Sequence, residues 1–285
     1  MQTLINQFFD TLFSEKARAI LERITLWLSI CGFVLHLGLI YSLKFQLINV
    51  LRDFPLLENP ISAIYTPFTF ILIYEIYLLV LYLPRSFTTS LSKQFEIISL
   101  ILIRRIFGDI PQVSLDVSWF ETTENLNLMY DLGGVLILYF LIYQFKKDSL
   151  KSVITGDSKK IDRFINSKKG ISLILIACLI CMSVYSFSHW LIELFSHSSF
   201  GNIDSIFYHD FFELLILADV FILLLSFQYT ERYTQILRNT GFVICTILIR
   251  LSFGTSGLTN VLLIISSVVF GLAILRIYNL SERSS

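Results

Sequence analysis

The sequence has few charged residues and no surplus of either sign. Only 15% of its 285 residues are charged, whereas soluble domains average roughly 25%. Basic and acidic residues each number 22, so the chain lacks the basic surplus typical of nucleic-acid binding and the acidic surplus of a disordered tail. Hydrophobic residues make up 55% of the chain, and the mean hydropathy is +0.71. The composition excludes a soluble globular protein and predicts a membrane protein.

The motifs of common enzyme chemistries are also missing. The sequence has no glycine-rich phosphate loop, no Ser-His-Asp arrangement, no HExxH run and no paired carboxylates in an aqueous domain. All four cysteines fall in apolar segments, so the closely spaced Cys178 and Cys181 are predicted to pack in the bundle rather than bind zinc or form a disulfide. We therefore expect neither an enzyme nor a metal or cofactor site.

Long apolar segments are abundant. A helix needs ~20 mostly apolar residues to cross ~30 Å of hydrocarbon. The segments form two sets of four, and the third member of each set is short and contains arginine. They are 24–42, 61–83, 95–107, 128–145, 171–195, 211–227, 241–253 and 258–277. The predicted fold class is an all-α integral membrane protein with eight transmembrane helices.

The first 23 residues do not resemble a cleavable signal peptide, because acidic residues interrupt them and no small-residue cleavage site follows a short apolar core. Their apolar residues recur at the three-to-four spacing of a one-faced helix, at Ile5, Phe8, Phe9, Leu12 and Phe13. This pattern predicts an amphipathic helix over 1–23 that lies on the membrane surface. A docking face for a cytoplasmic partner is the alternative.

The distribution of basic residues predicts the orientation, because lysine and arginine accumulate in cytoplasmic loops. With both termini inside, 17 of the 22 basic residues lie on the cytoplasmic side and only Lys44 and Arg52 lie outside. The remaining three, Arg104, Arg105 and Arg250, fall within the helices. We therefore expect a multi-pass protein with cytoplasmic N- and C-termini.

Two features indicate an internal repeat. A basic stretch, 146–170, separates repeat 24–145 from repeat 171–285 and is predicted to be a cytoplasmic linker. Twelve positions separate Lys93 from Arg105, and twelve separate Arg238 from Arg250. An Ile-Leu-Ile-Arg string also recurs at 101–104 and 247–250, although it shifts the register by one. Four helices per repeat would leave the two copies parallel.

The second repeat resembles the phosphate-starvation-inducible protein E (PsiE) family of small bacterial four-helix membrane proteins. From Arg238 to Arg283 it has a similar order: a basic residue, an apolar helix ending in Ile-Arg, the short connection GTSGLTNVL, a final span and a basic tail. The first repeat looks similar, with Glu75, Lys93 and Arg105, but its outer loop is longer. The resemblance implies a tandem duplication in a bacterial inner membrane with a link to phosphate stress, and it supplies no site residues.

Charged residues within the spans are the candidate functional residues, because each costs ~2.5 to 3.5 kcal/mol inside hydrocarbon unless it has a partner. By helical rise, Glu75 lies ~13 Å and Arg105 ~18 Å from the inner ends of their helices, so we expect them to pair. In the second repeat Arg250 would pair with Asp219, which matches better in depth, or with Glu213, which matches better in local sequence. Secondary candidates are Arg104, which could snorkel outward, and His36, which could bind a pigment or haem or be hydrogen-bonded in the bundle.

Two functions stay open. The charged pairs could form an ion pathway, which would make the protein a channel or carrier for a small ion. They could also be structural clasps in an accessory or scaffold subunit of a larger membrane complex. The lipid bilayer is an expected partner under both hypotheses, and a homo-oligomer is compatible with either.

Overall fold

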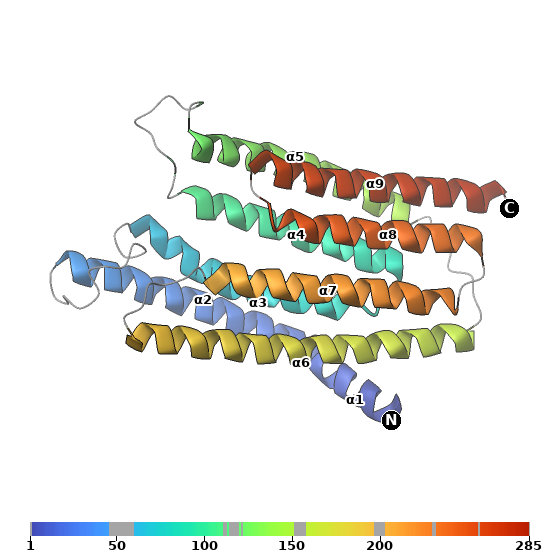
Figure 1. The fold of residues 1–285 in the computed structure, drawn as a ribbon, viewed down its shortest axis with the longest axis horizontal. Coiled ribbons are helices and arrows are strands. Elements are labelled where there is room, and N and C mark those ends of the chain that lie inside the picture. Colours follow the sequence, from blue (N-terminus) through green and yellow to red (C-terminus); the bar gives the residue numbers. More distant parts are fainter. Residues whose placement is uncertain are drawn as a thin grey trace.

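The computed structural model describes residues 2–45, 60–110, 113, 120, 122–150, 158–196, 203–229, 232–255 and 257–284. Within these residues every regular element is a helix (Figure 1). The elements are α1 (Gln2–Leu12), α2 (Glu15–Lys44), the short 3-10 helix η2 (Pro60–Ile64), α3 (Tyr65–Tyr82), α4 (Phe87–Asp109), α5 (Thr123–Ser149), α6 (Ser158–Ser196), α7 (Ile203–Phe227), α8 (Tyr233–Ser252) and α9 (Gly257–Ser284). The predicted all-α class is confirmed.

Each of the eight predicted apolar segments falls mainly within one of the helices α2 to α9, and segment 61–83 also covers η2. Among the described residues, five helical segments are long and apolar enough to cross a membrane: Asn6–Lys44, Pro60–Tyr82, Thr123–Ser149, Arg163–Met182 and Gly257–Glu282. The described parts of α4, α7 and α8 do not meet this criterion, because polar and charged side chains interrupt their apolar runs. The structure therefore supports a membrane protein, while eight spans remain a prediction.

The predicted linker 146–170 is largely helical. The helix α5 continues to Ser149, and α6 begins at Ser158. Leu150 and residues 151–157 separate the two helices, and residues 151–157 are outside the described residues. The structure differs from the predicted linker because a helix can continue beyond its apolar span, and charged residues are compatible with such a helix end. Two lysines of the predicted linker, Lys168 and Lys169, consequently lie about three turns into α6, against the protein.

The predicted helix over 1–23 is broken near its middle. The first part, α1, ends at Leu12, and Ser14 caps α2, since its hydroxyl accepts a hydrogen bond from the backbone N–H of Ala17 at 3.0 Å. The helix α1 packs on its neighbours: the Tyr77 hydroxyl donates to the Leu12 carbonyl at 3.0 Å, and Lys169 Nζ lies 5.0 Å from the centre of the Phe9 ring. That α1 also lies on the membrane surface remains a prediction.

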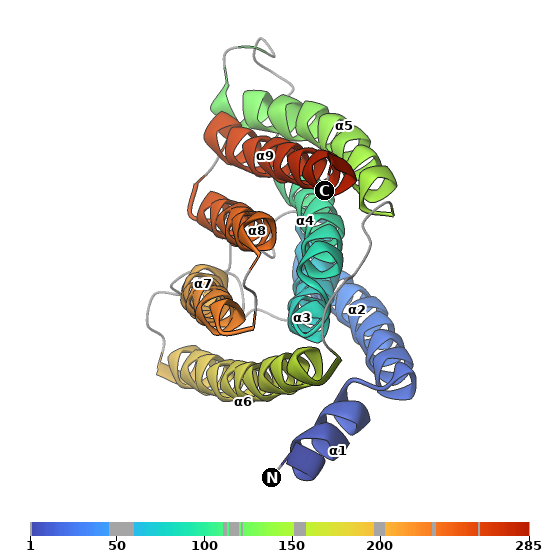
Figure 2. The ribbon, with the colours of Figure 1, turned by 90° about the vertical axis from the view of Figure 1, so that its right-hand side faces the viewer.

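The helices α2 to α5, called here the first set, meet α6 to α9, the second set, mainly through two corresponding pairs. The helix α5 packs along α9, and α4 contacts α8 (Figure 2). Within the sets, α3 contacts α4 and α7 contacts α8, so the helices that carry the expected charge pairs are neighbours. The helix α6 also contacts α3. The charged residues of α3, α4, α7 and α8 are thereby brought to the junction of the two sets.

Close helix approach and aromatic packing hold this junction together. A Cβ atom on Gly134 of α5 would lie only 2.5 Å from Val261 Cγ1 of α9, so the two helices meet at a position without a side chain. Phe95 and Phe145 pack edge to face at 5.1 Å between ring centres, and Phe242 of the second set lies 6.0 Å from Phe145. The two sets therefore share one continuous core.

Candidate functional site

The first charged pair joins α3 and α4. Glu75 is buried, and its Oε2 lies 3.7 Å from Arg104 Nε, while Arg104 Nη1 donates to the Phe68 carbonyl at 3.1 Å. The predicted pairing of Glu75 with Arg105 is therefore wrong. Adjacent residues on an α-helix point about 100° apart, and it is Arg104 that faces α3. The expectation that Arg104 snorkels outward is also wrong, because it faces its neighbour in the bundle.

Arg105 instead joins α4 to α5 and α9. Its guanidinium forms a two-pronged ion pair with Asp131, at 2.7 Å from Nε to Oδ2 and 2.6 Å from Nη2 to Oδ1. Nη2 also donates to Asn260 Oδ1 at 2.9 Å. The Asn260 amide in turn donates to the Ser252 carbonyl, which ties down the turn between α8 and α9. Arg105 thus links the two sets near this turn.

The third pair joins Asp219 of α7 to Arg250 of α8. Asp219 Oδ2 lies 2.5 Å from Arg250 Nη1, and both side chains are buried, so the depth-based pairing is confirmed. The Thr246 hydroxyl donates to the same Asp219 oxygen. Arg250 Nη2 lies 3.5 Å from Gln94 Oε1 of α4, across the junction between the sets. The pair is therefore connected to the first set through Gln94.

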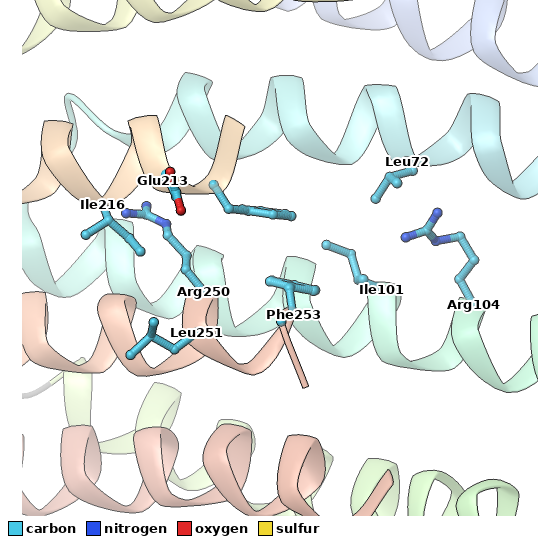
Figure 3. A pocket seen from close by; sticks show the side chains of 10 residues that line it. Leu72, Ile101, Arg104, Glu213, Ile216, Arg250, Leu251 and Phe253 are labelled. Atoms are coloured by element: carbon cyan, nitrogen blue, oxygen red, sulfur yellow. The ribbon is translucent and has the colours of Figure 1, made fainter. Parts of the chain in front are cut away.

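A pocket of about 410 Å³ lies between α3, α4, α7 and α8. Arg104 from the first set and Arg250 from the second set both line it, and Figure 3 shows Leu72, Ile101 and Phe253 between the two arginines. Glu213, which is exposed, lines the pocket beside Arg250. The arginines of the recurring Ile-Leu-Ile-Arg string thus meet at one pocket.

A second, smaller space of about 20 Å³ continues the polar interior, with room for about one water molecule. Ser90 and Gln94 of α4 line it from one side, and Asp219 and Thr246 line it from the other. Lys168 of α6 also lines it. Since Asp219 and Gln94 both contact Arg250, polar side chains connect this space to the larger pocket.

Lys168 closes the smaller space. Only 2% of the residue is exposed, and its ammonium group donates to the Arg85 carbonyl at 3.0 Å. It also lies 4.2 Å from the ring centre of Phe87 and 4.8 Å from that of Phe164, so two aromatic faces replace part of its water shell. Neither Lys168 nor Asp131 was singled out from the sequence, although an aspartate inside a predicted span was a usable signal.

His36 has a structural partner. Its Nδ1 lies 2.6 Å from the Thr66 hydroxyl, between α2 and α3, in agreement with the hydrogen-bonded alternative. In the described part of the chain no group of three or more His, Cys, Asp and Glu residues could hold a metal ion.

Comparisons with family models, curated proteins and solved structures found no match to this chain. The resemblance to the PsiE family therefore remains a prediction.

Proposed function

We propose that this protein is a channel or carrier for a small ion, with its ion site at the junction of the two sets. One observation carries the proposal: a chain of polar side chains runs from Lys168 through Asp219 and Arg250 to the pocket shared with Arg104. Purely structural clasps need partners but do not need a pocket between them. Intramembrane charges that line such a space are typical of ion pathways.

We also propose that the two sets are parallel copies of a PsiE-like four-helix unit. The contacts of α4 with α8 and of α5 with α9 support this, because corresponding helices meet around a two-fold axis in a duplicated unit. All eight helices would cross the membrane, since the charges of α4 and α8 have partners inside the bundle. The duplication supplies one arginine from each copy to the same pocket.

The proposed host is a bacterial inner membrane, with both termini in the cytoplasm. In support, α1 and the C-terminal end of α9 lie toward the same end of the molecule in Figure 1, as an even number of crossings requires. We expect a reporter cysteine at Ser158, in a variant whose four native cysteines are replaced, to resist an impermeant maleimide in intact cells and to react after permeabilisation. Labelling in intact cells would contradict the orientation.

Flux through purified protein tests the function. In proteoliposomes we expect Gln94→Leu to reduce ion flux about ten-fold, because it removes a hydrogen bond to Arg250 and places an apolar side chain in the smaller space. The matched control is Gln144→Leu on α5, away from the described lining residues of both spaces. Assembly, measured by size-exclusion chromatography, should be unchanged in both variants. Absence of flux in the wild type, with recovery in a larger complex, would favour the accessory-subunit alternative.

A further inference from the structure

We propose that the pocket between α3, α4, α7 and α8 binds a small organic anion whose acidic group contacts Arg104 and Arg250 and whose apolar body contacts the pocket wall. The inference rests on the proposed function, since it names the class of ion that this site takes. Three observations support it: the arginines of the ion pairs line the pocket, the pocket has the volume of a small-molecule site, and its other lining residues are mostly apolar.

The ion pairs present their positive ends to the pocket. Arg104 and Arg250 both line it, whereas their carboxylate partners, Glu75 and Asp219, are not among its described lining residues. The Nε of Arg104 is buried without a hydrogen-bond partner in the described chain, because the 3.7 Å separation from Glu75 is too long for a hydrogen bond. This nitrogen faces Glu75, so the carboxylate behind Arg104 compensates part of its charge, while the side chain itself lines the pocket.

The pocket is too large and too apolar for a lone inorganic ion to use its walls. Its volume of about 410 Å³ lies in the range of small-molecule sites, roughly 300 to 1,000 Å³. Leu72, Ile101, Phe212, Ile216 and Leu251 supply apolar surface between and around the arginines. A planar guanidinium matches a carboxylate with two parallel hydrogen bonds. A carboxylate joined to a compact apolar group uses both kinds of surface.

Glu213 makes it possible to test whether the ligand is negatively or positively charged. It is the acidic residue among the described lining residues, and its side chain is exposed in the pocket. An anion bound at the arginines is repelled by Glu213, whereas a cation in the same pocket is attracted to it. Neutralising Glu213 must therefore change the affinities for anions and for cations in opposite directions.

The experiment uses two fluorinated probes of similar shape, para-fluorobenzoate and para-fluorobenzylammonium, with the full chain in lipid nanodiscs and binding followed by fluorine NMR. We expect the wild type to bind the benzoate and Glu213→Gln to bind it about three-fold more tightly. The double variant Glu75→Gln/Arg104→Gln, which conserves net charge, should weaken it about ten-fold. Asp210→Asn, also on α7 and outside the described lining residues, is the matched control and should have no effect.

The outcomes separate this inference from the proposed function. Benzoate binding that responds as expected supports the anion site even if no flux is measured. Preferential binding of the ammonium probe, or weaker benzoate binding in Glu213→Gln, would overturn the anion site even if cation flux supports transport. Empty nanodiscs correct for partitioning into lipid, and absence of specific benzoate binding to the wild type would also overturn it. If the double variant fails to fold, substitution of the exposed Glu213 still shows whether the bound ligand is negatively or positively charged.

Discussion

Replacing Arg105 by leucine is expected to lower the free energy of unfolding by about 3 kcal/mol. The substitution leaves the Asp131 carboxylate, which is 1% exposed, without its two-pronged partner. Breaking a buried pair costs roughly 3 to 5 kcal/mol, and the lower end applies because the Arg105 side chain is 31% exposed. It also removes the bond from Arg105 to Asn260, which links the two sets. Unfolding by SDS in mixed micelles measures the loss.

The double variant Arg105→Leu/Asp131→Leu should recover part of this stability, because neither charge is then left unpaired. Lys147→Leu is the control, since it removes a positive charge from an exposed position on α5 and should change the stability by less than about 0.5 kcal/mol. Additive losses for Arg105→Leu and Asp131→Leu would refute the pairing, as would an Arg105→Leu variant as stable as the wild type.

Replacing Gly134 by leucine should be about as damaging, with an expected loss of about 3 kcal/mol. Even a Cβ atom at this position would lie 2.5 Å from Val261 Cγ1, and Val261 is buried in α9 with few other rotamers to adopt. The longer leucine side chain must push α5 away from α9. Since these helices belong to different sets, we expect the junction itself to loosen, measured as a lower Tm in detergent.

The neighbouring glycine is a matched control for this prediction. A Cβ atom on Gly133 would meet nothing within 4 Å, so Gly133→Leu should keep the wild-type Tm or raise it through better helix propensity. Val261→Ala should rescue part of the stability of Gly134→Leu by removing the clashing methyl groups. Equal effects of the two glycine substitutions would show that helix propensity, rather than the approach of α5 to α9, is responsible.

The sequence determined where the helices lie, because apolar run length alone sets how much chain can sit in hydrocarbon. It also gave Asp219 as the better match to Arg250 in depth, but it left Glu213 open as the alternative partner. Position along a helix says nothing of rotation about its axis, however. For this reason the sequence could not decide whether Arg104 or Arg105 faces Glu75. In the structure α4 is rotated so that Arg104 faces Glu75 and Arg105 forms an ion pair with Asp131.

Only the tertiary structure decided which charges are buried and what surrounds them. Lys168 belongs to a basic stretch that the sequence assigns to water, yet Phe87 of α4 and Phe164 of α6 enclose its ammonium group. Likewise, Arg104 and Arg250 are far apart in the chain and meet at one pocket because α4 packs against α8. Such contacts depend on how helices pack together, whereas apolar periodicity describes each helix by itself.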